Sequence, residues 1–379
     1  MTSRINAATR RATISATVLI SLATISGTAY AGEQFPPAPV PCPYISNIPT
    51  WGIAYNGAIQ CFVGTDPRLG AATTEIITPV VPIIVRFLNS KGDVEDTSDP
   101  TGPLFANPKT SAFDVVANSP LFTPYNYKLG STTLGETEWI EATERASFWN
   151  LPGATFKDWH LNLAFFPIPA VTIDVPDGDW ATNGTHSFKV DAGFLNPKLQ
   201  ALRPDYGHGA MPVFLFYNVS EYAHGKPTNC CVEGYHQAVE YSPAQYEFFV
   251  YATYFDGSGT DADLEPLSHE IAEFAHDPFG NNPVPPWPSP FTFSLPWKPP
   301  YTFTKCQGNL EVGDPLEDRD ASEEQFTITT AGMTYILQNV VTAAWQMHAE
   351  PSFSVNGWYT LKGAVDGEFA APAPACPSR

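Results

Sequence analysis

The sequence of 379 residues predicts a fold of the α+β class, with strands and helices mixed along the chain (mixed α/β). Short runs rich in branched and aromatic residues, typical of buried strands, alternate with a few segments of helical periodicity. Hydrophobic residues make up 43% of the chain, and 25 Phe, 16 Tyr and 9 Trp supply a sizeable core. The 38 prolines favour many ordered loops over long helices.

The N-terminus has the pattern of a secretory signal peptide, which we place at residues 1–31. Three arginines precede an apolar, acid-free run at 12–25, and small residues, Ala29 and Ala31, stand at the two positions that a signal peptidase reads. The alternative, a membrane anchor, requires roughly 20 strongly apolar residues, more than this run supplies. We therefore expect a secreted chain, extracellular or periplasmic, that starts near Gly32 and has no membrane span.

The chain is acidic, with 19 basic and 39 acidic residues and a net charge of −20. Without residues 1–31 it has 16 basic and 39 acidic residues, a net charge of −23. A field of this sign repels nucleic acid and anionic membrane surfaces, so we expect neither as a partner. It is compatible with bound cations. No pattern in the sequence predicts an oligomeric state.

The cysteines predict disulfides, because their number is even and the chain is expected to be exported. There are six: Cys42, Cys61, Cys230, Cys231, Cys306 and Cys376. Cys42 and Cys61 can close a local loop. We expect Cys230 and Cys231 to pair with different partners, since a disulfide between neighbours strains the backbone. A zinc–thiolate cluster is the alternative, but no C-x-x-C spacing occurs.

Three segments are expected after the signal peptide. Residues 32–75 are expected to form an extended arm, because six prolines lie within 32–50. Residues 76–365 are expected to form the folded domain, as one body or as two lobes. Residues 366–379 are expected to be a C-terminal tail.

The elements of the folded domain follow from local patterns. An apolar, β-branched run at 80–88 predicts an early core strand, and aromatic runs at 213–217 and 246–255 predict two further buried strands. Residues 160–190 alternate short strand-like pieces with turns. Helical spacing of apolar residues predicts helices at 112–118, 137–149, 268–274 and 334–345.

Two regions without such periodicity are expected to be loops. The polar segment between the last two predicted strands holds the adjacent cysteines and His236. From 278 to 300 the chain contains nine prolines, with Trp287 and Trp297 among them. This composition predicts a long, stiff, proline-rich loop.

The segment 267–278 concentrates side chains that bind divalent cations. On a helix, residues four apart share a face, so His269 and Glu273 can hold one ion together. Glu270 lies about 100° around the helix, beside this pair. Two ligands at i and i+4 with a carboxylate at i+1 are the arrangement of a metallopeptidase helix. The usual second ligand is histidine, but zinc also accepts the carboxylate that stands here.

A third protein ligand has to come from another segment. The best candidates are Glu311 and Asp314, which follow the proline-rich loop, and His236 is a further option. His276 shares the helix face but lies about 10 Å along the axis from His269, so we expect it behind the ligands or at the rim of the substrate site. The alternative to a metal site is a solvated polar helix face, which apolar neighbours such as Phe274 disfavour.

Several segments resemble one group of proteins. Residues 268–273 followed by Asp277-Pro278 resemble the H-E-x-x-E…D-P segment of secreted, mostly uncharacterised bacterial and fungal proteins. Plant phosphate-induced proteins of the EXORDIUM type have a similar segment. Further pieces at 135–149, 231–236 and 310–314 resemble the same group in the same order. The resemblance implies a zincin-like fold, with a mixed sheet packed against the metal-site helix, and a metal held by His269, Glu273 and a downstream acid.

Two functions are expected from these observations. The first is a secreted zinc-dependent hydrolase, a metallopeptidase that uses metal-activated water. Its Zn²⁺ is held by His269, Glu273 and Glu311, and Glu270 is the general base. Its substrate, a peptide or a polysaccharide-associated chain, lies in a cleft walled by the 278–300 loop. The alternative is a non-catalytic extracellular or cell-wall-associated protein with a structural metal or none.

Overall fold

The computed structural model of the chain describes residues 42, 47–55, 57–256, 261–289, 306–317, 319–349, 353–363, 367–374 and 376. The expected signal peptide, 1–31, and Trp297 lie outside the described residues. No helix in the described part of the chain is long and apolar enough to cross a membrane.

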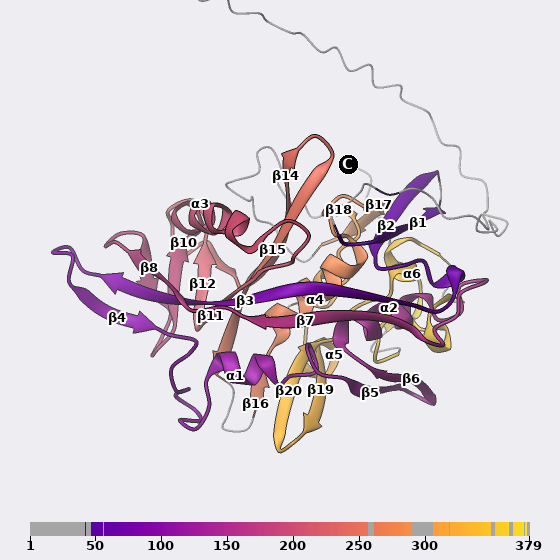
Figure 1. The fold of residues 1–379 in the computed structure, drawn as a ribbon, viewed down its shortest axis with the longest axis horizontal. Helices are drawn as coiled ribbons and strands as arrows, with labels where there is room; N and C mark the ends of the chain where they lie inside the picture. Colours follow the sequence, from indigo (N-terminus) through magenta and orange to yellow (C-terminus); the bar gives the residue numbers. More distant parts are fainter. Residues whose placement is uncertain are drawn as a thin grey trace, which may run out of the picture. The chain divides into compact units, whose positions relative to one another are not determined.

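A mixed sheet of ten strands forms the centre of the fold (Figure 1). The main path runs β19-β20-β16-β15-β11-β3-β4, while β14 pairs with β15, and β7 and β8 pair with β3. Both parallel and antiparallel ladders occur, because β11 is parallel to β3 and β15, whereas β14 is antiparallel to β15. The strands are β3 (Ala72–Leu88), β4 (Val94–Ser98), β7 (Trp159–Pro167), β8 (Val171–Val175), β11 (Val213–Tyr217), β14 (Gly234–Ser242), β15 (Gln245–Asp256), β16 (Asp261–Asp263), β19 (Gln325–Thr330) and β20 (Met333–Gln338).

Smaller sheets complete the strand structure. A four-stranded sheet has the order β13-β12-β10-β9, and three hairpin-like pairs are β1-β2, β5-β6 and β17-β18. These strands are β1 (Thr50–Tyr55), β2 (Ala58–Val63), β5 (Tyr125–Leu129), β6 (Thr132–Thr137), β9 (Trp180–Thr182), β10 (Phe188–Asp191), β12 (Val219–Tyr222), β13 (Cys230–Val232), β17 (Pro283–Pro288) and β18 (Cys306–Asn309).

The described helices are fewer than the strands, and the two that carry or support the site, α2 and α4, are almost entirely buried. The α-helices are α1 (Ala112–Ala117), α2 (Trp139–Phe148), α3 (Ala192–Leu202), α4 (Glu265–His276), α5 (Ala321–Glu324) and α6 (Ala343–Gln346). The 3-10 helices are η1 (Pro67–Leu69), η2 (Arg203–Tyr206), η3 (Asp314–Leu316), η5 (Val355–Gly357) and η6 (Gly367–Ala370). Every residue of α2, and every residue of α4 after Glu265, is buried. The fold thus belongs to the predicted α+β class.

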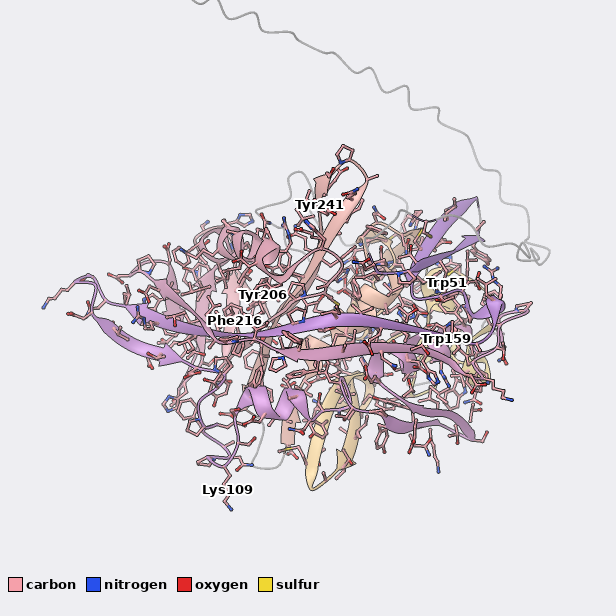
Figure 2. The ribbon with its side chains drawn as sticks, in the orientation of Figure 1. Trp51, Lys109, Trp159, Tyr206, Phe216 and Tyr241 are labelled. Atoms are coloured by element: carbon pink, nitrogen blue, oxygen red, sulfur yellow. A yellow bond between two sulfur atoms is a disulfide. The ribbon has the colours of Figure 1, made fainter. Side chains whose placement is uncertain are left out.

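Alternate residues of β11, whose Phe216 is labelled in Figure 2, belong to two different cores. Val213 and Leu215 belong to the larger cluster of buried residues, which includes apolar residues of α2 and α4. Phe214 and Phe216 belong to the smaller cluster, which includes Leu195 of α3. Because successive side chains of a strand point to opposite faces, the central sheet is covered on both faces, by α2 and α4 on one and by α3 on the other.

The predicted helices and strands are confirmed in most places. β11 has the expected bounds, β15 contains the strand expected at 246–255, and β3 contains that expected at 80–88. Helices α1, α2 and α4 lie within or around the segments expected at 112–118, 137–149 and 268–274. The helix α4 starts earlier than expected, at Glu265, whose backbone N–H is capped by the Asp263 carboxylate at 3.0 Å.

The prediction of a helix at 334–345 is wrong. Residues 333–338 form β20, and only α6 is helical. Tyr335 and Leu337 are buried and Ile336 between them is only partly buried, an alternation typical of a strand and not of a helix. The turn that decides between them is Ala331-Gly332, where both residues have positive φ, 51° and 82°, so that β19 and β20 close into a hairpin.

The polar loop expected between residues 217 and 246 is also wrong. It contains β12, β13 and β14, and β14 pairs along its length with β15. The alternation of polar and apolar residues in β14 suits a strand with one face toward the protein. His236 thereby lies on a strand rather than on a loop.

The arm expected at 32–75 is folded, not extended, from Thr50 onward. Strands β1 and β2 form an antiparallel hairpin, and the side chains of Trp51 and Phe62 are buried in the larger core. Proline is dense only up to Pro49, so the hairpin can form its ladder beyond it. The expected C-terminal tail also differs, because Phe369 is buried and Cys376 is bonded to Cys306.

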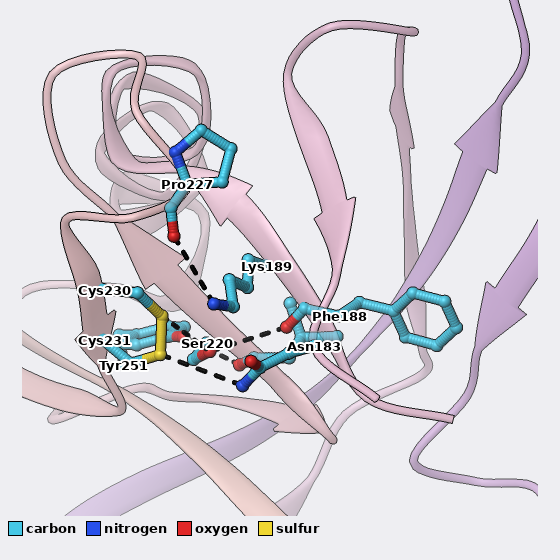
Figure 3. Close-up of a disulfide and its surroundings, with 9 residues drawn as sticks. Asn183, Phe188, Lys189, Ser220, Pro227, Cys230, Cys231 and Tyr251 are labelled. Atoms are coloured by element: carbon cyan, nitrogen blue, oxygen red, sulfur yellow. Dashed lines mark hydrogen bonds between the residues drawn. A yellow bond between two sulfur atoms is a disulfide. The ribbon is translucent and has the colours of Figure 1, made fainter. Parts of the chain in front are cut away.

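The disulfides follow the prediction in part. Cys42–Cys61 closes the expected local loop, and Cys306–Cys376 is a second bond. The expectation that Cys230 and Cys231 pair with different partners is wrong, because they are bonded to each other (Figure 3). A cis peptide bond between them brings the two side chains together. The three disulfides are compatible with an extracellular protein.

Candidate metal centre

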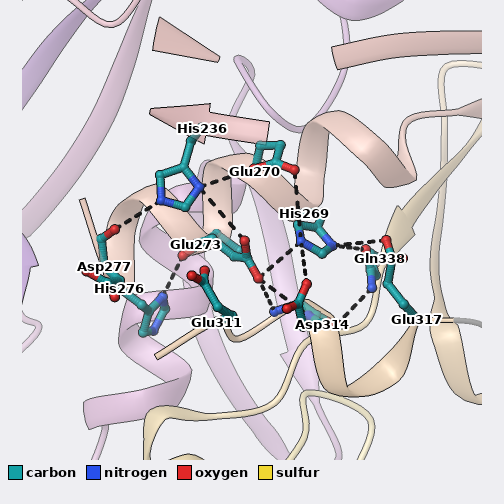
Figure 4. A network of polar contacts seen from close by, with 12 residues as sticks. His236, His269, Glu270, Glu273, His276, Asp277, Glu311, Asp314, Glu317 and Gln338 are labelled. Carbon is teal, nitrogen blue, oxygen red and sulfur yellow. Dashed lines mark hydrogen bonds and ion pairs between the residues drawn. The ribbon is translucent and has the colours of Figure 1, made fainter. Parts of the chain in front are cut away.

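Helix α4 carries the central residues of a buried polar cluster (Figure 4). His269, Glu270 and Glu273 are 5%, 5% and 4% exposed, although they are among the most polar residue types. They face strand β14, the end of β20 and the segment after β18. Side chains of these types are almost never buried without partners, so we expect each of them to be hydrogen-bonded or paired with a charge.

The predicted pair at helical spacing is present. His269 Nε2 lies 3.1 Å from Glu273 Oε1. Asp314, at the start of η3, brings its Oδ1 to 3.6 Å from the same nitrogen. One donor atom from each of these three residues lies within 4.8 Å of the other two, which is close enough to hold one ion.

A glutamine fixes the orientation of the His269 ring. Nδ1 of His269 donates to Oε1 of Gln338 at 2.6 Å. The amide of Gln338 cannot be reversed without cost, because its Nε2 donates to the carbonyl of Gly313 at 3.0 Å. In the neutral ring, Nε2 of His269 therefore carries the lone pair, on the side of Glu273 and Asp314. Histidines that bind metals usually donate their other ring N–H to such a partner.

Asp314 is held in a similar way. Its Oδ2 accepts a hydrogen bond from Nε2 of Gln307 at 2.8 Å, which leaves Oδ1 toward His269. Glu273 is held by the backbone, because the N–H of Gly313 donates to its Oε1 at 3.1 Å. The three candidate ligands are thus oriented by neighbours on three different elements.

His236 approaches the cluster from β14. Its Nε2 donates to the carbonyl oxygen of Asp277 at 3.0 Å. Its Nδ1 lies 3.1 Å from Glu270 Oε2 and 3.8 Å from Glu273 Oε2. His236, Glu273 and Glu311 form a second group whose donor atoms lie within 4.8 Å of one another. His236 was one of the options for a third ligand, and it instead belongs to this second group.

Glu311, the expected third ligand, lies next to Glu273 but is grouped with His236 rather than with His269. Asn309 donates to its Oε1 through Nδ2. Its Oε2 is buried and accepts no hydrogen bond from the described residues. Both acids of this turn therefore reach Glu273, and Asp314 is the one that completes the group around His269.

Two glycines allow this close packing. A Cβ atom at Gly313 would lie 2.5 Å from Nδ1 of His269, and one at Gly234 would lie 2.9 Å from Cγ of Glu270. Real Cβ atoms do not approach other atoms so closely. Any larger residue at either position would displace a side chain of the cluster.

Burial and neighbouring charges shift the pKa values of the cluster. Burial alone would lower the pKa of His269, but the carboxylates of Glu273 and Glu270 raise it well above its usual value. Burial would raise the pKa of Glu273, but the imidazole of His269 lowers it to about 2. Burial and the charge of Glu273 raise the pKa values of Glu311 and Asp314 well above the usual range. Each carboxylate therefore needs an imidazolium, a proton or a cation to remain buried here.

His276 is not at the rim of a substrate site, because it is fully buried. Its Nδ1 donates to the carbonyl of Ala272 at 2.8 Å, and its Nε2 accepts from the hydroxyl of Ser147 at 2.9 Å. Nδ1 is thus bonded within α4, and Nε2 holds α4 against α2. Burial lowers its pKa to about 4, so the ring is neutral at pH 7.

Trp287, expected to line a substrate cleft, is buried in the core. Its Nε1 donates to the carbonyl of Asn309 at 3.0 Å, so it supports the segment that carries Glu311. A surface pocket lined by residues such as Lys128 and Phe326 lies on β5 and β19 and contains none of the cluster residues.

No family model matches the chain, and neither the search of curated proteins nor the search of solved structures returned a match. The chemistry of the cluster has to follow from its own residues.

Proposed function

We propose that the protein is an exported metal-dependent hydrolase whose divalent cation, zinc, binds to His269, Glu273 and Asp314. The observation that carries the proposal is the contact between His269 Nδ1 and Gln338, which leaves Nε2 to face both carboxylates. Imidazole nitrogen and carboxylate oxygen are donors that zinc accepts. Asp314 replaces Glu311 as the third ligand.

A zincin-like fold is part of this proposal. In support of it, two of the ligands, His269 and Glu273, lie on a buried helix, α4, which packs on a mixed sheet, as the resemblance implies. A second buried helix, α2, packs against α4 through Trp139, whose Nε1 donates to the carbonyl of Ser268 at 2.9 Å. This contact holds the first turn of the ligand helix in place.

Glu270 is suited to the role of general base. A divalent cation supplies Lewis acidity, which lets water lose a proton near neutral pH. The carboxylate of Glu270 lies 4.0 Å from Nε2 of His269, close to the ligands but outside their group. Nδ1 of His236 lies 3.1 Å from its Oε2, on the side of Glu270 next to β14. Glu270 can therefore accept a proton next to the ion and pass it to a leaving amine.

The exposed side of the cluster suggests the direction of substrate binding. The side chain of His269 is 6% exposed, that of Asp314 15% and that of Glu317, 3.5 Å from His269 Nδ1, 35%. Exposure thus increases toward η3. We propose that a peptide, or a chain associated with polysaccharide, approaches along this side.

The depth of the cluster also favours a second candidate, a non-catalytic extracellular protein with a structural metal. Its central residues are more than nine-tenths buried. A structural zinc site is closed by four protein ligands, whereas a catalytic one keeps a position for water. The two candidates therefore differ in whether a small anion or a hydroxamate can bind to the loaded centre.

The test uses the full exported chain, loaded with Zn²⁺ and incubated with a broad peptide library. Cleavage that a chelator abolishes and added Zn²⁺ restores is the expected result. Glu270→Gln is expected to keep the metal and to lose cleavage by several orders of magnitude, because only the proton acceptor is changed. Glu95→Gln on exposed β4 is the matched control. Full zinc content without any cleavage contradicts the hydrolase and supports the structural candidate.

A further inference from the structure

The two oxygens of Glu273 face two different histidines. Oε1 lies 3.1 Å from Nε2 of His269, and Oε2 lies 3.8 Å from Nδ1 of His236 (Figure 4). A carboxylate that bridges two metal ions likewise directs one oxygen toward each ion. We infer that the centre binds two divalent cations bridged by Glu273, an inference that rests on the proposed metal function and extends it.

Each cation has its own set of residues. The first ion position consists of His269, Glu273 and Asp314, and the second ion position consists of His236, Glu273 and Glu311. Only Glu273 belongs to both. The residues of the second position come from β14, α4 and the turn after β18, so the fold and not one local motif brings them together.

The hydrogen bonding of His236 points to the second ion position. The carbonyl oxygen of Asp277 can only accept, so Nε2 of His236 must carry a hydrogen. In the neutral ring, Nδ1 then presents a lone pair to Oε2 of Glu270 and Oε2 of Glu273. Acceptors that face one another in a buried site repel each other unless a proton or a cation lies between them. A cation satisfies all of them at once.

Glu311 supplies an independent observation. Its side chain is about nine-tenths buried, with 9% exposed. Asn309 donates to Oε1, while Oε2 is buried and has no hydrogen-bond donor among the described residues. A buried carboxylate oxygen without a donor is costly. Because Glu311 belongs to the donor group of His236 and Glu273, a cation in the second ion position removes this cost.

The carboxylates around the two ion positions outnumber the cationic side chains. Glu270, Glu273, Glu311 and Asp314 lie here, and their ion pairs are with histidines. Glu317 lies 3.5 Å from Nδ1 of His269, and the buried Asp277 adds a further carboxylate next to His236. No lysine or arginine of the described chain lies within ion-pair distance of the first four. A second divalent cation therefore compensates buried negative charge that a single cation leaves.

The donor types define the class of cation. One imidazole nitrogen and two carboxylate oxygens at each position suit Zn²⁺, Mn²⁺ or Fe²⁺. Two ions in such centres lie about 3.5–4 Å apart and together stabilise the charge that develops on oxygen in the transition state of hydrolysis. The second ion position therefore extends the proposed hydrolase from a mononuclear to a co-catalytic centre.

The test measures metal stoichiometry and coupling in the full exported chain. The protein is stripped with a chelator, loaded with Mn²⁺ and separated from free ion. We expect about two equivalents of Mn²⁺ per chain and an exchange-coupled electron paramagnetic resonance spectrum. His236→Gln and Glu311→Gln are each expected to reduce this to about one equivalent with a mononuclear spectrum. Glu95→Gln is the control and is expected to keep both ions.

The outcomes separate this inference from the proposed function. One equivalent that survives Glu311→Gln and is lost in Asp314→Asn overturns the second ion and leaves the first in place. One equivalent that is lost in Glu311→Gln but survives Asp314→Asn overturns the pair and also the proposed ligand set. No bound metal overturns both. If a variant fails to fold, as judged by its thermal unfolding, the spectrum of the native protein decides alone, and a mononuclear spectrum overturns the inference.

Discussion

Ser147 of α2 and His276 of α4 are joined by a hydrogen bond of 2.9 Å between the serine hydroxyl and Nε2 of the imidazole. The same hydroxyl accepts from the backbone N–H of Ala343 at 3.2 Å, so one serine ties two buried helices to the start of a third. The ring of His276 also packs beside the rings of Phe62 and Phe148, with centroids 6.2 and 6.1 Å away. This histidine packs behind the candidate metal centre and belongs to neither of the two proposed ion positions.

Replacing His276 by alanine is expected to lower the free energy of unfolding by about 3 kcal/mol, because a cavity forms and Ser147 loses its partner in the core. Metal content at saturating Zn²⁺ is expected to stay unchanged. Denaturant unfolding of the loaded protein measures the first effect and elemental analysis the second. His224→Asn on an exposed turn is the control, since asparagine tolerates the positive φ of 60° there. Loss of the metal from a folded His276→Ala protein contradicts this role.

Gly313→Ala is expected to weaken metal binding by about 10–100-fold, because the new Cβ would lie 2.5 Å from Nδ1 of His269 and displace the ring from Gln338. Gly308→Ala is the matched control from the same segment, where the nearest atom to a Cβ is 3.8 Å away. Competition with a chromogenic chelator measures the two affinities. Equal affinities in the two variants would show that the ring of His269 is not part of the ligand set.

Gln338→Leu tests whether the hydrogen bond from Nδ1 to Gln338 orients the ring of His269. The variant removes the acceptor of the Nδ1 hydrogen at 2.6 Å, so we expect a loss of metal affinity of about 10–100-fold. Gln338→Glu retains an acceptor oxygen and is expected to lose less, although the bond to the Gly313 carbonyl disappears. Isothermal titration with Zn²⁺ gives both values. A larger loss in the glutamate variant than in the leucine variant runs against this assignment.

The buried carboxyl of Glu221, which is not part of the candidate metal centre, makes the free energy of unfolding depend on pH. Burial raises its pKa from 4.5 to about 8, against a hydrogen bond from Asn196 that lowers it. The folded state therefore keeps a proton that the unfolded state loses. Stability from this group is full below pH 4.5, falls as the pH rises to about 8, and is constant above. The expected difference is on the order of a few kcal/mol.

Glu221→Gln removes this titration, so its unfolding free energy is expected to change less between pH 5 and pH 8 than that of the native protein. Urea unfolding at several pH values measures both. Glu240→Gln on the exposed edge of β14 is the control and is expected to retain the native pH dependence. Parallel curves for the native protein and Glu221→Gln would mean that Glu221 is ionised in the folded state.

The local part of the site was predictable from the sequence, and the part set by tertiary structure was not. His269 and Glu273 share a face because of helical periodicity alone, and their spacing survives in α4. Glu311 and Asp314 are three residues apart in one turn, so their roles depend on how η3 bends after Gly313. Sequence spacing carries no information about that bend.

The sequence predicts a loop at His236, because the residues before β14 are polar and contain adjacent cysteines. Its place in the cluster depends on the register of β14 against β15, where His236 lies opposite Val250. A shift of one residue would turn the ring to the other face of the strand. The sequence also does not predict the role of Gln338. It predicts a helix at 334–345, where the structure has strand β20, which carries Gln338.

The side chain of Asn282 bonds both the N–H and the carbonyl of Cys61, each at 2.8 Å, across 221 residues of sequence, and also the carbonyl of His276 at 2.6 Å. Contacts of such long sequence separation form late in folding, because a large loop must close first. The hairpin β1-β2 emerges early from the ribosome and can pack on Phe148 of α2, but its contact with the end of α4 can form only after α4 has been made. The contacts of Asn282 that fix the end of α4 therefore form only after most of the chain has been made. We expect the candidate metal centre to assemble late in folding.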